Sequence, residues 1–223
     1  MNPASPKHLA LFCLSLALLS SAAAHAQDPT LIHRVDDHYN QLHTLRARYT
    51  EHYTGMGLDR TESGTLLLKK PGLMRWSYDQ PAGKLFLLDG HFAWFYTPGD
   101  PQVSRALAKQ LDDLRSPLRL LLGHTQLAKE LDQLTTSPEG PAGATGQAFR
   151  ITGIPKGMAQ RVRLLTLIVT PTGAIERMKI EETDGAVTEF AFTNMEENIA
   201  VKPSDFTFSP PPGVTIVDAL PPI

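Results

Sequence analysis

The sequence predicts a single, mainly β domain with about eleven strands, one helix before them and one or two helices inserted between them. Three observations support this fold class. Short apolar and aromatic runs recur along most of the chain. Turn pairs such as Pro71-Gly72 and Asp89-Gly90 separate neighbouring runs. Helical periodicity is confined to one stretch near residue 30 and one between residues 112 and 134.

The first 26 residues have the pattern of a secretory signal peptide. Lys7 and His8 form a short basic region, and Leu9–Leu19 is an apolar core that is too short to span a bilayer comfortably. An A-x-A cleavage site ends at Ala26. We therefore expect residues 1–26 to be removed during secretion. The alternative is that they stay attached as an N-terminal anchor.

The cysteine content and the charge exclude several classes of protein. Cys13, the single cysteine, follows Phe12 in the middle of the apolar core, whereas a lipidated bacterial protein needs a small residue before its modified cysteine. Residues 27–223 are therefore expected to be one soluble, unlipidated domain without disulfides or thiol chemistry. This length can bury a sizeable core without cross-links. The formal net charge of -2 does not favour nucleic-acid binding.

The first element of the predicted domain is a helix. Asp28 is a good N-cap residue, and Pro29 suits the first helical turn. Apolar side chains then recur at helical spacing and form one stripe, made of Leu31, Val35, Tyr39 and Leu42.

Strands are predicted after this helix because the apolar residues alternate or run together between turn signals. In the first strand, Leu45, Ala47 and Tyr49 share one face, while Arg46 and Arg48 lie on the other. The predicted strands of this half cover residues 45–53, 63–70, 73–79, 84–89, 91–97 and 102–108.

The middle of the chain changes character. Residues 112–134 have a helical composition, with Ser116 and Pro117 as N-cap and first residue of a short helix and Gly123 at its end. A Pro/Gly-rich surface loop at residues 137–146 follows. Four more strands and an extended tail are predicted at residues 147–153, 161–169, 173–182, 186–194 and 203–223.

The chain carries little that could support catalysis or metal binding. No nucleophile elbow, zinc-protease motif, phosphate loop or C-x-x-C motif occurs in residues 27–223. His33, His38 and His43 are five residues apart, so one helix face cannot bring them together. We therefore expect no enzyme, no metal site and no cofactor.

Several strands are apolar on both faces. Residues 85–88, 91–96 and 164–169 do not alternate between apolar and polar side chains. One interpretation is a sheet with a packed core on one face and a helix or second sheet on the other. The other is a barrel or half-barrel with an apolar concave face covered by helices. The pattern alone leaves both open.

Four segments, read together, resemble the LolA family of periplasmic lipoprotein carriers. They contain the patterns K-x-P-x-x-x-x-W, D-G-x-x-x-W-x-Y-x-P and F-x-F-x-P-P-x-G-V, in this order and over essentially the whole of residues 27–223. The segments are residues 66–81, 87–103, 116–123 and 205–218.

The resemblance implies an incomplete antiparallel β-barrel of about eleven strands, with a helical lid over an apolar cavity. It implies a periplasmic carrier that accepts an acylated lipoprotein from the inner-membrane transporter LolCDE and hands it to the outer-membrane receptor LolB. Such a carrier needs no catalytic groups. We expect it to act as a monomer and to bind no nucleic acid.

The resemblance also assigns site residues, each of which could instead be ordinary core. Leu31 and Val35 on the first helix are lid residues. The second helix contributes Leu118, Leu121 and Leu122. The cavity wall is expected to contain Leu66, Leu68, Trp76, Tyr78 and Phe86.

Lys70 departs from the family pattern, in which an arginine before this proline resembles a latch that holds the lid. Lys70 shares parity with Leu66 and Leu68, so it should point inward. A lysine is a point charge without the planar fork of arginine, so a lysine latch would hold fewer lid carbonyls. The alternative is a strand-end lysine that reaches water. Met74 matches a position expected near the transporter contact.

Three other functions stay open from the sequence. The same fold could carry another lipid or a glycolipid. Lys70, in place of the family's arginine, and the loop at residues 137–146 support this alternative. A lipid hydrolase would need a catalytic arrangement that no motif indicates. A structural envelope protein would have a dry, fully packed interior.

Overall fold

The computed structural model describes residues 28–113, 126–140 and 146–219. The predicted signal peptide lies outside the described residues, as do Leu118, Leu121 and Leu122 with the short helix expected around them. Among the described residues, no helix has the length and apolar character needed to cross a bilayer.

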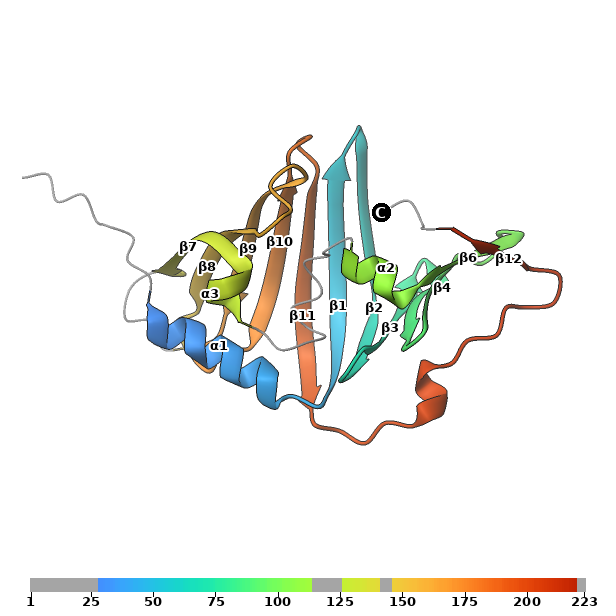
Figure 1. Cartoon of the computed structure of the whole chain (residues 1–223), viewed down its shortest axis with the longest axis horizontal. Coiled ribbons are helices and arrows are strands. Elements are labelled where there is room, and N and C mark those ends of the chain that lie inside the picture. Colours follow the sequence, from blue (N-terminus) through green and yellow to red (C-terminus); the bar gives the residue numbers. More distant parts are fainter. Residues whose placement is uncertain (1–27, 114–125, 141–145, 220–223) are drawn as a thin grey trace, which may run out of the picture.

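One curved, open sheet makes up most of the described chain (Figure 1). Its strand order is β12-β6-β5-β4-β3-β2-β1-β11-β10-β9-β8-β7, and every neighbouring pair is antiparallel except β6 and β12. The strands are β1 (Thr44–Gly55), β2 (Leu58–Lys69), β3 (Leu73–Gln80), β4 (Ala82–Asp89), β5 (Phe92–Tyr96), β6 (Gln102–Leu107), β7 (Leu131–Pro138), β8 (Phe149–Pro155), β9 (Val162–Val169), β10 (Ile175–Glu182), β11 (Val187–Glu197) and β12 (Thr215–Asp218). The predicted mainly β, incomplete barrel is confirmed, with twelve described strands.

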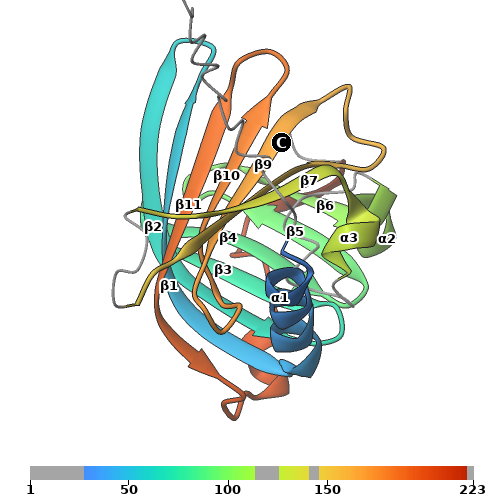
Figure 2. The ribbon, with the colours of Figure 1, turned by 90° about the vertical axis from the view of Figure 1, so that its left-hand side faces the viewer.

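Helix α1 (Pro29–Gln41) lies across the concave side of the sheet (Figure 2). It begins as predicted, because the Asp28 carboxylate accepts hydrogen bonds from the amides of Thr30 and Leu31. The predicted apolar stripe is buried, with Leu31 and Val35 at 0% exposure and Tyr39 at 2%. This stripe fixes which side of α1 faces the sheet.

The predicted turns connect neighbouring strands. Gly72 has a φ of 75°, so it supplies the left-handed conformation that the turn between β2 and β3 needs. At the next hairpin, Asp89 Oδ1 accepts hydrogen bonds from the amides of His91 (2.8 Å) and Phe92 (2.7 Å). These local signals explain why β2 to β5 follow each other as neighbours in the sheet.

The prediction of helical structure up to Leu134 is wrong at its end. Helix α3 covers only Leu127–Glu130, and β7 begins at Leu131. Gln133 has a φ of 52°, and the register with β8 shifts there, so Leu131 and Leu134 are both buried. Their spacing of three residues imitates a helix, but a bulged strand produces it.

Three further elements refine the prediction. Helix α2 (Ala108–Asp113) directly follows β6. The tail after residue 203 is mostly extended, as expected, but it contains a short 3-10 helix, η2 (Pro203–Phe206). It also supplies β12, which pairs with β6 in parallel.

Two hydrophobic clusters explain the strands that are apolar on both faces. The inner cluster joins α1 to the concave face, and the outer cluster lies on the convex face of β2 to β6. The segment Ile199–Val214, hereafter the outer strap, covers the outer cluster with Phe206 and Phe208. Within residues 85–88, Leu85 and Leu87 point outward, while Leu88 joins the inner cluster.

Candidate functional site

The concave face brings most of the predicted cavity-wall residues together. Leu66 and Leu68 of β2 lie opposite Trp76 and Met74 of β3, and Trp76 in turn lies opposite Phe86 of β4. Leu66 and Leu68 are fully buried, and Trp76 is 2% exposed. Tyr78 and Phe86 are partly buried and pack against the same cluster. The sequence parity therefore selected side chains that form one apolar surface.

Leu31 and Val35 of α1 belong to the same inner cluster, so this helix contributes to the apolar interior on the concave side. Met74 is also part of the cluster and is only 1% exposed. The indole nitrogen of Trp76 donates a hydrogen bond to its sulfur at 2.9 Å. Met74 is thus interior in this state, and its role in contacting a transporter stays a prediction.

Lys70 reaches the end of α1. Its ammonium group donates a hydrogen bond to the main-chain carbonyl of Tyr39, in the last turn of the helix. The last carbonyls of a helix lack partners within it, and they carry the negative end of the helix dipole. Burial lowers the pKa of Lys70, because desolvation disfavours the charged amine. One charged side chain thus connects the end of β2 to the helix above it.

Other polar contacts hold α1, and the sequence reasoning did not find them. The Ile175 amide donates to the Tyr39 phenol at 3.1 Å, and His38 Nε2 lies 3.0 Å from a Glu197 carboxylate oxygen. The Leu127 amide donates to the Asp36 carboxylate at 3.0 Å, which ties α3 to α1. Burial raises the pKa of Asp36, although this hydrogen bond opposes the shift. Tyr39 could have been found, because it is the one polar-tipped residue of the apolar stripe.

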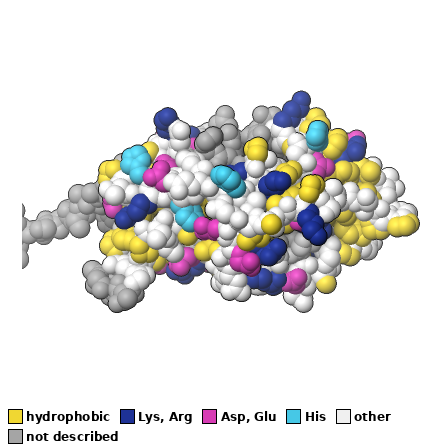
Figure 3. Space-filling model, turned by 90° about the horizontal axis from the view of Figure 1, so that it is seen from below, with side chains coloured by type: hydrophobic (Ala, Val, Ile, Leu, Met, Phe, Trp, Pro, Cys, Tyr) yellow, Lys and Arg dark blue, Asp and Glu magenta, His cyan; other side chains and the backbone are white. Residues whose placement is uncertain are grey.

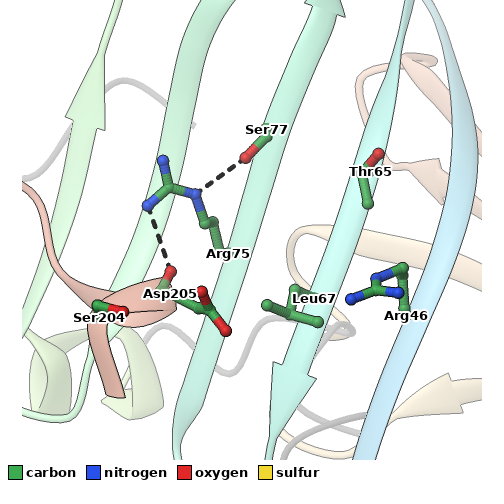
Figure 4. Close-up of a pocket in the computed structure, with 7 residues that line it drawn as sticks. All are labelled: Arg46, Thr65, Leu67, Arg75, Ser77, Ser204 and Asp205. Carbon is green, nitrogen blue, oxygen red and sulfur yellow. Dashed lines mark hydrogen bonds between the residues drawn. The ribbon is translucent and has the colours of Figure 1, made fainter. Parts of the chain in front are cut away.

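A hollow of about 390 Å³ lies on the convex face, beside η2 (Figure 4). The Arg75 guanidinium donates to the carbonyls of Asp205 (3.3 Å) and Thr207 (3.2 Å), and to the Ser77 hydroxyl (3.0 Å). Arg46 lines the opposite wall (Figure 4). This polar hollow is unsuited to an acyl chain, and Arg75 serves there to hold the outer strap.

Charged side chains of both signs are interspersed on the side of the molecule that lies below in Figure 1 (Figure 3). Among the described residues, no three His, Cys, Asp or Glu side chains are grouped so that they could hold a metal ion. The apolar cluster of the concave face is the largest group of buried hydrophobic side chains among the described residues, and such a surface can shield an apolar group from water.

Comparison with known proteins agrees with this arrangement. The family model described as "Outer membrane lipoprotein carrier protein LolA" matches residues 40–209. The chain belongs to the LolA family. The match starts near the end of α1, so the assignment of α1 as a cover rests on the geometry. The resemblance of the sequence motifs is confirmed.

Curated relatives of this LolA-family chain cover it almost completely. A protein of Pseudomonas aeruginosa named outer-membrane lipoprotein carrier protein is 30% identical over 93% of this chain and 96% of its own length. A Nitrosospira multiformis protein of the same name is 28% identical over 92% of this chain and 96% of its own. An uncharacterized conserved protein from Thermus thermophilus shares the fold, with a TM-score of 0.53 at 12% identity over 85% of this chain and 98% of that one.

Proposed function

We propose that this protein is a periplasmic carrier for acylated lipoproteins. It would accept cargo from an inner-membrane transporter of the LolCDE type and deliver it to an outer-membrane receptor of the LolB type. The observation that carries the proposal is an apolar concave face, built by Leu66, Leu68 and Trp76, under a separate helix. The names of the relatives support the choice of lipoprotein as cargo.

The energetics of such cargo fit a site of this kind. Burying an acyl chain is worth about 0.8 kcal/mol per CH₂ group, so a chain of roughly sixteen carbons represents on the order of 12 kcal/mol. Such a chain cannot cross an aqueous compartment unshielded. A carrier must also release it, so its site should be apolar, non-covalent and closed by a movable cover.

We propose that α1 is this movable cover and that Lys70 is its latch. In the closed state Leu31 and Val35 occupy the apolar face themselves, so cargo has to displace α1. The hydrogen bond from Lys70 to the Tyr39 carbonyl favours the closed state and helps to expel the cargo. The acyl chains would then contact Leu66, Leu68, Trp76, Tyr78 and Phe86, and Leu118, Leu121 and Leu122 are expected to add to the cover.

The first test identifies the cargo. The protein without its signal peptide is tagged, recovered from the periplasm of its own host and subjected to mass spectrometry. Acylated lipoproteins in roughly equimolar amount would support the proposal. A free lipid or glycolipid would replace it with the related carrier function that the sequence left open. Recovery of neither would overturn both.

The second test concerns the latch. Lys70→Leu is expected to accept lipoprotein but to release less than about a tenth as much to a receptor in a defined transfer assay. Lys69→Leu is the matched control, because it changes the neighbouring lysine on the other side of the strand. Equal delivery by the two variants would remove the latch from the proposal.

A further inference from the structure

The concave face has a second, polar level beyond the apolar one. Along β1 and β2, the inward positions after Ala47 and Leu66 are Tyr49, Glu51, Gly64 and Glu62. Tyr49 lies opposite Gly64, and Glu51 lies opposite Glu62. On β3 and β4, Tyr78 and Lys84 continue this level, toward the hairpin end of β1 and β2 at the top of Figure 1.

Glu62 and Lys84 form a largely buried ion pair within this polar level. The Lys84 ammonium lies 2.5 Å from a Glu62 carboxylate oxygen and 4.4 Å from the centre of the Tyr78 ring. Glu62 is only 7% exposed. Replacing a buried ion pair by apolar residues of similar volume is often neutral or stabilising. Stability alone therefore gives no reason for charge at this position of an apolar face.

Two more polar groups of this level, Tyr49 and Glu51, lie beside the ion pair. Tyr49 is only 2% exposed, and its hydroxyl interacts with the Tyr78 phenol. Glu51 is partly buried and interacts electrostatically with Lys84 and Arg60. Burial and the neighbouring Glu62 raise the pKa of Glu51, while Lys84 and Arg60 oppose the shift. Polar groups gathered at low exposure on an otherwise apolar face call for an explanation, because removing them from water is costly.

Tyr49 is directed into this level by the absence of a side chain at Gly64. A Cβ atom at Gly64 would lie 2.0 Å from the Ser77 carbonyl oxygen of β3 and 2.9 Å from the Tyr49 hydroxyl, so the glycine leaves room for both. The ring packs edge-on against Trp76 at 4.5 Å and Tyr78 at 5.5 Å between centroids. Its oxygen therefore lies at the boundary between the apolar level and the polar level.

We propose that the polar level binds the ester and amide groups that join acyl chains to the first residue of a lipoprotein. The ester carbonyls accept hydrogen bonds from Lys84 and Tyr49, and the amide N–H donates to Glu51. The chains then run toward α1, and the polypeptide leaves at the hairpin end of β1 and β2. This inference rests on the proposed carrier function. It adds an orientation for the bound lipoprotein and a specificity for the groups that link its acyl chains.

The test compares two synthetic lipopeptides with equal chain lengths. Both have an N-terminal acyl amide; one has two ester-linked acyl chains, and the other has two ether-linked alkyl chains in their place. Binding of each to the protein without its signal peptide is measured by calorimetry or by displacement of a fluorescent lipid. The wild type is expected to bind the acyl lipopeptide about tenfold more tightly, since two or more hydrogen bonds separate the two probes.

Tyr49→Phe removes one oxygen and is expected to lower this preference about threefold. Lys84→Met combined with Glu62→Met removes the ion pair without leaving a lone charge, and it should abolish most of the preference. Tyr96→Phe, on the convex face, is the matched control and should keep the full preference. Chemical denaturation of each variant verifies that it folds.

Three results would overturn the inference. Equal affinity of the wild type for the two lipopeptides would mean that the linkage is not recognised, although the carrier function would stand. A preference that survives both Tyr49→Phe and the double methionine variant would locate recognition elsewhere. Failure of both lipopeptides to bind would overturn the carrier function, and the linkage site with it.

Discussion

The two faces of the sheet are both covered, but by different means. The outer strap covers the convex face of β2–β6, and α1 lies on the concave side, where its polar contacts reach Ile175 of β10 and Glu197 of β11. Burial is complete on both faces, since Leu87 on the convex face and Leu66 on the concave face are each 0% exposed. Burial alone therefore does not distinguish a permanent cover from a removable one.

The two tryptophans reveal the difference. On the convex face, the Trp94 indole donates to a carboxylate oxygen of Asp89 at 2.7 Å. On the concave face, the Trp76 indole donates to the sulfur of Met74. A carboxylate is a strong acceptor, whereas a thioether is a weak acceptor on a flexible side chain. The outer ring is thus held by a stronger hydrogen bond than the inner ring.

The largest predicted loss of stability comes from a change in the outer strap. Phe206 of η2 is 3% exposed in the outer cluster. Phe206→Ala is expected to lower the free energy of unfolding by about 3–5 kcal/mol, through lost burial and an unfilled cavity. Urea denaturation measures this loss. Affinity for lipopeptide should be unchanged wherever the variant is folded, because the strap does not touch the concave face.

The matched change in the removable cover should behave differently. Leu31→Ala should cost no more than the free energy that docks α1 on the sheet, because the sheet can stay folded without the helix. Adding Val35→Ala should then cost little more. The loss of unfolding free energy in the double variant should therefore be smaller than the sum of the losses in the two single variants. Full additivity, with unfolding of the sheet in each variant, would show that α1 is ordinary core.

Local sequence signals were sufficient for much of the fold. The Asp28 cap, the stripe of α1 and the turns at Gly72 and Asp89 all depend on neighbours in sequence, and the structure confirms them. Strand parity likewise assigned Leu66 and Leu68 to one face, and both lie in the inner cluster. The bulge at Gln133 was not predicted, because it places buried leucines three residues apart, which is also the spacing of a helix.

The parts that the sequence could not give depend on contacts between distant segments. Tyr39 meets Ile175, and Arg75 meets the carbonyls of Asp205 and Thr207, more than a hundred residues away in each case. Nothing in the residue pattern specifies such partners, because they arise only when the sheet curves. The ion pair of Glu62 and Lys84 was missed for a different reason, because a charged residue in a strand usually lies on the solvent-exposed face.

An intermediate effect is expected at the anchor of Trp94. Asp89→Asn places an amide where the indole needs an acceptor, so about 1–2 kcal/mol of stability should be lost in neutral solution. Burial opposes ionisation of Asp89, but hydrogen bonds from Phe92, Trp94 and His91 outweigh it and lower its pKa from 3.8. The stability from this carboxylate is thus present above pH 3.8 and is lost as the pH falls through the lowered pKa.

The measurement is the difference in urea stability between wild type and Asp89→Asn as a function of pH. The difference should shrink as the pH falls below 3.8. A constant difference across this range would mean that the charge of Asp89 does not contribute to the anchor.

The smallest predicted loss of stability concerns the two arginines that line the convex hollow, which are expected to differ. Arg75→Gln should cost about 1 kcal/mol, because it removes donors to two carbonyls of the outer strap. Arg46→Gln should cost no more than about 0.5 kcal/mol, because Arg46 makes only a half-exposed ion pair with Glu196 at 3.5 Å. Hydrogen exchange of the Thr207 amide should increase with Arg75→Gln alone. Equal exchange in both variants would mean that apolar burial holds the strap without help from Arg75.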